Sequence, residues 1–429
     1  MPPSAQRAWQ EQRMRRLVRH AARHVPLWKE LLRDAGISAD SIQTLQDFAS
    51  LPVTSKQTFV GRAVEECIDN SRRATSNWYV TSGTSGEPFQ FLMSEQAIDE
   101  AFIDFASLRF LWWRGMPLRE ISERRHTRIK IRGLNNARRQ FIPVAEVLSD
   151  LPQVLGKIAA FRPFILSAYP SILLEICQAL ARDPALPRIR LPFVLSIGEM
   201  LPASIRALAI ESLGCEVYDR YGLEEIGVIG VECAMHDGFH INTESVLIEV
   251  VDDRFQQAIE GTEGRILATD LLNENMPFMR YLTGDTGRIS YARCTCGLRS
   301  PRLWVAGRYS AYLAFPERRI HHLEFDGAMD GFMHIIFRYQ VVKVSDSAVT
   351  VRIVPGPAYH QTVDEHIRAS IGALVGPAIS VAIEVVAEIP TTPRGKSRIV
   401  ADESVVQALD THEDRLKYGG PEGSSSVLS

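Results

Sequence analysis

Phe193-Val194-Leu195-Ser196-Ile197-Gly198-Glu199 is the stretch that decides the fold class of this chain. Its first three residues form a short apolar run, and a Gly-Glu pair follows soon after. Similar short runs occur at 164–166 and 216–218, and helix-length segments separate the three runs. This alternation predicts parallel strands joined by helices, which is an α/β layered fold. Ligands bind at the loops that follow the strands in such folds, so Gly198 and Glu199 stand in a candidate binding loop.

Outside this core the sequence pattern changes in both directions. Strands predicted at 246–251, 265–268 and 288–291 are closely spaced and separated by turns, which indicates a smaller β-rich subdomain. After Gly307, strands are predicted at 332–336, 341–344, 349–354 and 380–386 and a helix at 362–374, which together are typical of a compact α+β module. Towards the N-terminus, apolar spacing predicts helix over 8–35 with a break at 24–26, and a buried helix over 97–113.

These patterns predict three parts. The first is a large N-terminal domain at 1–307, and the second is a small α+β C-terminal domain at 308–405. The third is a tail at 406–429, whose end is rich in Gly, Ser and Pro and is therefore expected to be disordered.

Composition excludes several classes of protein. The chain has 429 residues, of which 45% are hydrophobic and 23% charged, as is usual for a soluble globular protein with a large core. A net charge of −3 gives no reason to expect nucleic acid or an anionic membrane as partner. No apolar run approaches the roughly 20 residues that span a bilayer, and the Arg-rich N-terminus lacks an apolar signal core. Six cysteines in so long a chain do not indicate a disulfide framework, so we expect a reduced, cytoplasmic protein.

Basic residues crowd the segment 114–139, where nine Lys or Arg stand against two Glu. A solvated helix face or loop would explain this charge. A docking surface for an acidic or phosphate-bearing partner would explain it as well.

A Ser/Thr/Gly-rich loop follows a β-like dipeptide at 79–80 and ends at Pro88. The loop consists of Thr81, Ser82, Gly83, Thr84, Ser85 and Gly86. Its glycines allow close approach of the backbone to a ligand, and its hydroxyls and N–H groups can surround an anion such as a triphosphate. A flexible surface linker has the same composition.

Cysteines and histidines form a candidate metal site. Cys294 and Cys296 lie two residues apart on a predicted turn, and Cys233 lies upstream with His236 and His240 near it. Three thiolates and one imidazole suit tetrahedral Zn²⁺, and four protein ligands leave no open position for catalysis. The residues alone leave open which histidine completes the set, and unrelated thiols are the alternative.

Several motifs together resemble the adenylate-forming, acyl/aryl-CoA ligase superfamily, and in particular its phenylacetate–CoA ligase-like branch. The resemblance runs from about residue 10 to 405. It is carried by the loop at 81–86, by Asp219-Arg220-Tyr221-Gly222-Leu223-Glu224-Glu225, by Arg280-Tyr281-Leu282-Thr283-Gly284-Asp285, by Gly307-Arg308 and by Pro393-Arg394-Gly395-Lys396.

The resemblance implies a site for ATP. The loop at 81–86 would hold the triphosphate, and Gly198, Glu199, Asp219 and Gly222 would belong to the nucleotide and acyl pocket. Tyr221 would stack on adenine, Glu225 would ligate Mg²⁺, and Asp285 would accept the ribose hydroxyls.

Arg308 would lie near ribose or phosphate. Lys396 would reach the substrate carboxylate and the α-phosphate from a C-terminal lid domain that moves about a hinge. Tyr169, Ser196, Gly198 and Gly222 are predicted to line the substrate pocket. The same branch often carries a structural zinc site, and its pattern fits His240 better than His236.

Three positions depart from the family pattern. Glu87 stands where a Lys usually follows the phosphate loop, and Ser310 stands at the hinge position that is usually Asp. Glu317 begins the segment aligned with the glycine-bearing loop that relatives use to build the thiol tunnel. Ser310 and Glu317 weaken the prediction of free coenzyme A as acceptor, and they favour a carrier-protein thiol or an amine.

The leading hypothesis from the sequence is therefore an ATP- and Mg²⁺-dependent enzyme of secondary metabolism that activates an aromatic carboxylic acid as acyl-AMP. Two alternatives remain open: an aryl-CoA ligase proper, and a catalytically degenerate nucleotide-binding protein. Relatives in this branch are commonly dimers, so a homodimer is a further expectation.

Overall fold

The computed structural model describes residues 3–60, 62–75, 77–80, 90–93, 100–130, 137–308, 312–315, 319–332, 335–356, 358–389 and 400–402. The chain divides into two compact units, Met1–Ser310 and Ala311–Ser429. Each unit is described by itself below. The predicted tail at 406–429 lies outside the described residues.

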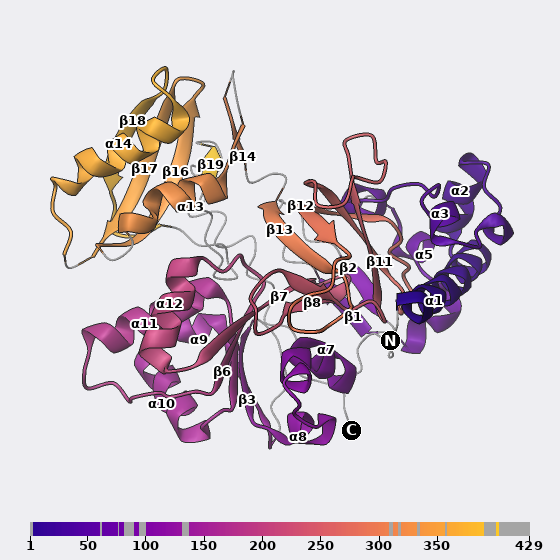
Figure 1. Cartoon of the computed structure of the whole chain (residues 1–429), viewed down its shortest axis with the longest axis horizontal. Helices are drawn as coiled ribbons and strands as arrows, with labels where there is room; N and C mark the ends of the chain where they lie inside the picture. The colour runs from indigo at the N-terminus through magenta and orange to yellow at the C-terminus, as the bar shows by residue number, and fades with distance from the viewer. Residues whose placement is uncertain are drawn as a thin grey trace. The chain divides into compact units, whose positions relative to one another are not determined.

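One large sheet organises the first unit (Figure 1). Within the described residues it has 11 strands in the order β10-β11-β12-β13-β9-β8-β7-β6-β5-β3-β4. The strands are β3 (His126–Lys130), β4 (Arg139–Pro143), β5 (Ile165–Ala168), β6 (Phe193–Ile197), β7 (Glu216–Leu223), β8 (Gly227–Glu232), β9 (Phe239–Ile241), β10 (Val246–Val251), β11 (Gly264–Asp270), β12 (Tyr281–Ser290) and β13 (Arg302–Arg308). Strands β3 to β7 pair in parallel, and β7 to β13 pair antiparallel.

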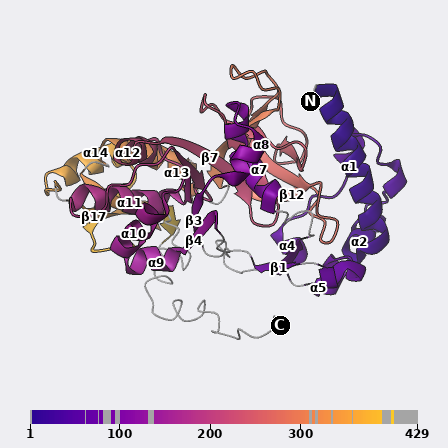
Figure 2. The ribbon, with the colours of Figure 1, turned by 90° about the horizontal axis from the view of Figure 1, so that it is seen from below.

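Helices cover the parallel part of the sheet. They are α7 (Glu100–Trp113), α8 (Leu118–Glu123), α9 (Val144–Ser149), α10 (Leu151–Phe161), α11 (Pro170–Arg182) and α12 (Ala203–Leu213). Figures 1 and 2 show α9 to α12 on one side of β3 and β6, and α7 and α8 on the other. Every residue of β5 is buried, as expected for a strand with helices on both faces. The predicted α/β class is confirmed.

The β-rich part predicted at 246–290 is the antiparallel end of this same sheet. Strands β10, β11 and β12 cover the three predicted segments, and β8 and β9 join them to the parallel strands. The alternation of the sequence changes here because antiparallel strands need only tight turns, whereas parallel strands need crossover helices.

N-terminal helices pack on the antiparallel end, and Figure 2 shows α1, α2, α4 and α5 gathered beside β1 and β12. The elements are α1 (Pro3–His24), α2 (Pro26–Asp34), η1 (Ala39–Ser41), α3 (Leu45–Phe48), α4 (Lys56–Phe59), α5 (Val64–Cys67), η2 (Asn70–Thr75), β1 (Asn77–Val80) and β2 (Gln90–Met93). The predicted break at 24–26 is confirmed. Val25 is extended because Pro26 follows it, and Pro26 opens α2 at its first turn.

The second unit is a small α+β body. It contains β14 (Tyr312–Ala314), β15 (Arg319–His321), α13 (His322–Met329), η3 (Asp330–Phe332), β16 (Ile336–Ser345), β17 (Ala348–Pro355), α14 (Val363–Val375), β18 (Ser380–Val385) and β19 (Val400–Asp402). The sheet order is β18-β17-β16-β19, and apolar side chains of α13 and α14 share one core with β16 and β17. At the strand predicted over 332–336, Phe332 instead ends a 3₁₀ turn and Ile336 begins β16.

Ion pairs within the chain engage part of the basic segment 114–139. Arg119 pairs with Glu123, Arg124 with Glu120, and Arg114 with Glu216. The i,i+4 pairs of Arg119 and Arg124 favour the interpretation of a solvated helix face. Within the described residues, no helix combines the length and apolarity needed to cross a membrane.

A buried carboxyl group at the end of β11 gives the fold a testable pH dependence. Asp270 is 3% exposed, and its Oδ1 accepts hydrogen bonds from the amides of Leu272 (2.8 Å) and Asn273 (3.3 Å). Burial raises the pKa of Asp270 to about 7. Between about pH 4 and pH 7 the unfolded chain ionises this group while the folded chain keeps it protonated, so the group lowers stability as pH rises through this window.

We therefore expect the stability of Asp270→Asn, measured relative to the wild type, to be higher at pH 8 than at pH 5 by about 2 kcal/mol. The amide keeps the Oδ1 acceptor and removes the ionisation. Urea unfolding midpoints at the two pH values measure the difference. Asp252→Asn is the matched control, because Asp252 accepts from the amides of Arg254 and Gln256 on an exposed turn. An equal stability difference at both pH values would contradict the prediction.

Candidate active site and metal centre

Predicted pocket residues lie where neighbouring parallel strands end. Tyr169 follows β5, and its side chain is 3% exposed. Ser196 lies on β6, is fully buried, and stands in register with Asp219 on β7. Gly198 turns the chain after β6 with φ +74°, a conformation that favours glycine. The structure therefore brings these segments of the predicted pocket together.

Glu199 connects the loop after β6 to the start of α11. Its carboxylate accepts hydrogen bonds from the amide of Ser171 (3.0 Å) and from the Ser171 hydroxyl (3.1 Å). Ser171 is the second residue of α11, and the positive end of a helix dipole favours a carboxylate there. Glu199 thus holds the loop against the helix that follows Tyr169.

Asp219 is buried beside a second acid. Its backbone amide donates to Glu232 Oε2 (2.9 Å), and its Oδ1 accepts from the amide of Arg220 (2.9 Å). Burial, followed by the charge of Glu232, raises the pKa of Asp219 to about 7. The carboxyl group is therefore divided between its protonated and ionised forms near neutral pH.

Tyr221 and Gly222 stand at an irregularity of β7. The register with β8 shifts between these two residues, which is the signature of a β-bulge. A Cβ on Gly222 would lie 2.4 Å from the carbonyl oxygen of Gly227, so only glycine fits here. The bulge bends the strand next to the tyrosine that is predicted to stack on adenine.

The Tyr221 hydroxyl donates to Asp285 Oδ2 at 2.6 Å. Asp285 is 6% exposed and follows Gly284, which has φ +81°. The Asp285 amide donates to Thr283 Oγ1 (3.1 Å), whose hydroxyl in turn donates to the carbonyl of Ile266 (3.0 Å). Two predicted nucleotide-binding residues, 64 positions apart in the sequence, are therefore in direct contact.

A second tyrosine–carboxylate hydrogen bond joins the same two segments, and here the tyrosine lies on β12 and the carboxylate follows β7. Glu225, in the turn between β7 and β8, accepts a hydrogen bond from the Tyr281 hydroxyl at 2.9 Å. The Glu225 side chain is buried, with 8% of the residue exposed. Tyr221 and Glu225 thus each meet a partner of opposite type on β12.

Other predicted site residues lie outside the described residues. These are Thr81, Ser82, Gly83, Thr84, Ser85, Gly86 and Lys396, together with the departures Glu87, Ser310 and Glu317. The strands that flank the loop are described: β1 and β2 pair antiparallel up to Val80 and Gln90. The Asn273 side chain donates to the carbonyl of Leu92 (2.8 Å), which fixes β2 to the segment before β12. The backbone of Arg308 stands in register with Asp285.

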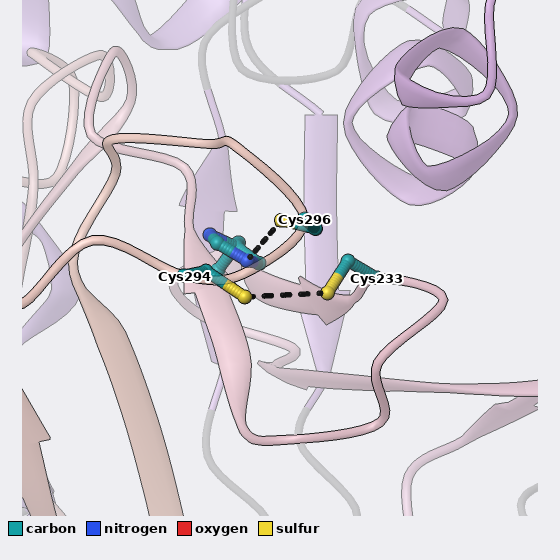
Figure 3. A group of neighbouring side chains, drawn as sticks. Cys233, Cys294 and Cys296 are labelled. Carbon is teal, nitrogen blue, oxygen red and sulfur yellow. Dashed lines mark hydrogen bonds between the residues drawn. The ribbon is translucent and has the colours of Figure 1, made fainter.

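Four predicted metal ligands form a compact cluster (Figure 3). Cys233, His240, Cys294 and Cys296 place their ligand atoms within 4.8 Å of one another, and three of the four residues are buried. Figure 3 shows the Cys233 and Cys294 thiols facing each other across a dashed line. Cys233 Sγ lies 3.9 Å from Cys294 Sγ, and Cys296 Sγ lies 3.4 Å from His240 Nε2.

His236 lies apart from this cluster. Its Nδ1 is 3.1 Å from Glu232 Oε2 and 3.2 Å from an Arg206 nitrogen, and its backbone has φ +50°. The Arg206 guanidinium also donates to both oxygens of Glu232 at 2.8 and 3.0 Å. His236 therefore belongs to an ion-pair network with Glu232, and His240 is the histidine that the structure places among the thiols.

Three side chains in this region were assigned no role from the sequence: Ser171, Glu232 and Tyr281. Tyr281 has a sequence signal, because it stands inside the motif at 280–285, and in the structure it shares one buried face of β12 with Thr283 and Asp285. Ser171 and Glu232 have no comparable signal, since their contacts depend on how the strands are placed.

The chain resembles known ligases in sequence and in fold. No family model matches the chain. The chain is 26% identical over 365 residues to the phenylacetate-coenzyme A ligase of Thermus thermophilus. The aligned residues cover 80% of this chain and 79% of that protein. It is 25% identical over 295 residues to the phenylacetate-coenzyme A ligase of Aromatoleum evansii, which covers 66% of each chain.

Among solved structures, the chain is similar to 2-hydroxyisobutyryl-CoA ligase in its postadenylation state, in complex with R3-HIB-AMP. The TM-score is 0.79 at 18% sequence identity, over 97% of this chain and 93% of that chain. This likeness confirms the predicted fold class. Together with the sequence relatives, it confirms the predicted resemblance to adenylate-forming ligases.

Proposed function

We propose that this chain is an adenylate-forming ligase that uses ATP to convert a carboxylic acid into acyl-AMP and then passes the acyl group to a thiol. One observation carries the proposal. Motif residues from two segments of the sequence meet in two tyrosine–carboxylate hydrogen bonds, Tyr221–Asp285 and Tyr281–Glu225. The similarity to phenylacetate-coenzyme A ligases supports the reaction class.

Asp285 is the proposed ribose ligand. A carboxylate has two oxygens and can accept both ribose hydroxyls, and the turn at Gly284 fixes the backbone on which it stands. Tyr221, whose hydroxyl holds Asp285, offers its ring as the stacking surface for adenine.

Asp219, Gly222, Gly198 and Glu199 are the proposed remainder of the nucleotide and acyl pocket. Gly222 is suited to this role because it admits no side chain beside the strand bend. Glu199 is suited to it because its hydrogen bonds to Ser171 hold the pocket loop in place.

In the proposed first step, a carboxylate oxygen of the acid attacks the α-phosphorus of ATP and the bond to pyrophosphate breaks. The products are acyl-AMP and pyrophosphate, and no redox partner is needed. Lys396 would stabilise the negative charge that grows on the α-phosphate, with Arg308 near the same group. Mg²⁺ is held in proteins by one or two carboxylates plus substrate phosphates, and the buried Glu225 carboxylate fits that role. When bound, Mg²⁺ would offset phosphate charge.

The acid is proposed to be aromatic, because the sequence relatives are ligases of phenylacetate. Tyr169 and Ser196 are the proposed pocket residues for it: Ser196 stands in register with Asp219, and Tyr169 follows Ala168, which stands in register with Ser196. Coenzyme A is the acceptor that the names of the relatives favour. A carrier-protein thiol or an amine is the alternative that Ser310 and Glu317 favour, since those positions depart from the usual second half-reaction.

The cysteine–histidine cluster is proposed to hold a structural Zn²⁺. With Zn–S bonds of about 2.3 Å and Zn–N bonds of about 2.0 Å, tetrahedral geometry requires S···S distances of about 3.8 Å and S···N distances of about 3.5 Å. The observed 3.9 Å and 3.4 Å agree with both values. Burial lowers the pKa of His240 to about 4, so its ring is in the neutral form that ligates metals.

The ring of His240 is oriented by a further contact. Its Nδ1 lies 2.9 Å from the Ser300 hydroxyl, which leaves Nε2 for the cluster. Burial raises the pKa of Cys233 to about 12, so a cation is needed to stabilise its thiolate. Four protein ligands complete the coordination, so the ion would have no catalytic role.

We expect the purified chain to catalyse ATP–pyrophosphate exchange that depends on an aromatic acid. Lys396→Ala should lower the exchange rate by about 10²- to 10³-fold, because a charge-stabilising group is lost at the reacting phosphate. Lys343→Ala is the control, since Lys343 pairs with Asp346 within the small unit. If none of the acids in a broad aryl and alkyl panel supports exchange, the result would instead favour the degenerate nucleotide-binding protein.

The acceptor is identified in the same preparation. Consumption of free coenzyme A, without turnover of carrier proteins or amines, would support the aryl-CoA ligase proper and exclude the alternative acceptors. Turnover of carrier proteins or amines, without consumption of free coenzyme A, would support those acceptors and exclude the aryl-CoA ligase proper.

We also expect about one zinc ion per chain by elemental analysis of protein purified without chelators. Cys296→Ser and His240→Ala should each lower the zinc content well below one, because a ligand is lost. His236→Ala is the matched control and should retain zinc, since His236 contacts Glu232 and Arg206 instead. Equal zinc loss in the two histidine variants would contradict the assignment.

A further inference from the structure

The ring of Tyr281 packs against two aromatic side chains, Phe278 three residues before it and Phe59 at the end of α4. Its centroid lies 5.3 Å from that of Phe278 and 6.2 Å from that of Phe59, and the last two are 4.9 Å apart. Tyr281 is 2% exposed, Phe278 is fully buried and Phe59 is 4% exposed. Rings packed at these distances, with interplanar angles of 76° to Phe278 and 56° to Phe59, keep the tyrosine in one orientation.

The backbone of Tyr281 is held on both sides by Thr54, in a parallel bridge outside the main sheet. The Thr54 amide donates to the carbonyl of Arg280 (3.1 Å), and the amide of Leu282 donates to the Thr54 carbonyl (2.8 Å). The Thr54 hydroxyl donates to the carbonyl of Met279 (2.9 Å). A segment far upstream in the sequence therefore clamps residues 279–282.

Arg280, directly before Tyr281, has φ +46°, a conformation that costs a non-glycine residue about 1 kcal/mol or more. Its surroundings maintain that conformation. The Arg280 amide donates to Thr269 Oγ1 (2.9 Å), and its buried guanidinium donates to both oxygens of Glu249 (3.2 and 3.3 Å) and to the carbonyl of Leu51 (2.6 Å). Strained residues held in this way are concentrated at functional sites.

These contacts hold the ring and the backbone of Tyr281, and its hydroxyl donates to Glu225 Oε1 in a buried setting. We propose that Tyr281 is a positioning residue that holds the Glu225 carboxylate for the Mg²⁺ of bound ATP. The inference rests on the proposed function, in which Glu225 ligates that ion. Tyr221 does the same for Asp285, so each nucleotide carboxylate has its own phenol.

Tyr281→Phe tests the proposal, because it removes the hydroxyl and keeps the ring that Phe59 and Phe278 enclose. Calorimetric titrations measure the dissociation constants of ATP with and without Mg²⁺, and of AMP without it. In the wild type, Mg²⁺ should tighten ATP binding. In Tyr281→Phe this tightening should shrink about tenfold, as expected when a hydrogen bond to a charged ligand is lost, while AMP binding is unchanged.

Two further variants sharpen the test. Glu225→Gln should show the same loss of Mg²⁺-dependent tightening, and adding Tyr281→Phe to it should change little, because the two residues act as one unit. Tyr359→Phe is the matched control, because it also removes a phenol that donates to a carboxylate, that of Asp364 in the small unit. If Tyr281→Phe does not fold, Phe59→Leu loosens the ring and should weaken the same tightening.

Three outcomes would overturn the inference. The positioning role is excluded if Mg²⁺ tightens ATP binding in Tyr281→Phe as much as in the wild type. Phe59→Leu is judged in the same way if Tyr281→Phe does not fold. Equal weakening of AMP and Mg²⁺-ATP binding shows a general structural role instead. A wild type that neither binds ATP nor catalyses exchange defeats the proposed function as well, so the two failures are distinguishable.

Discussion

Two hydrogen bonds between tyrosine and carboxylate connect parts of the large unit that are distant in its sheet. Tyr221 and Glu225 belong to β7 and the turn after it, and Asp285 and Tyr281 belong to β12. Strands β8, β9 and β13 stand between β7 and β12 in the hydrogen-bonding order. The sheet must therefore curve strongly enough for these side chains to meet, as twisted sheets do. The candidate chemistry depends on that curvature.

The support for these bonds comes from the N-terminal residues. The N-terminal helices share one hydrophobic core with β10, β11 and β12, and Thr54 and Leu51 bind the backbone and side chain of the segment before β12. Buried carboxylates are costly unless hydrogen bonds satisfy them, so the position of each phenol matters. The first 60 residues thus belong to the architecture of the site, although none of them was predicted to touch a ligand.

The sequence predicted the fold class because local patterns carry it. Alternating apolar runs and helix-length segments predict the parallel strands, and Pro26 marks the break between the first two helices. The sequence did not predict that β8 and β9 join the parallel and antiparallel strands into one sheet, because local patterns do not specify which strands pair. For the metal site, spacing admitted both His236 and His240, and only the strand pairing between β9 and β13 places His240 near the thiols. The Tyr281–Glu225 bond spans 56 positions, so motif matching named the segments and not the contact.

The central claim is that Tyr221, Asp285 and their neighbours form a nucleotide site. Calorimetric titration of AMP into the wild type and into Asp285→Ala tests this most directly, because AMP needs neither the acid nor the acceptor. The account predicts saturable binding of one AMP per chain, weakened about 10- to 100-fold in the variant, as expected for lost hydrogen bonds to a charged group. Absence of saturable binding by the wild type, or equal affinity in Asp285→Ala, would contradict it.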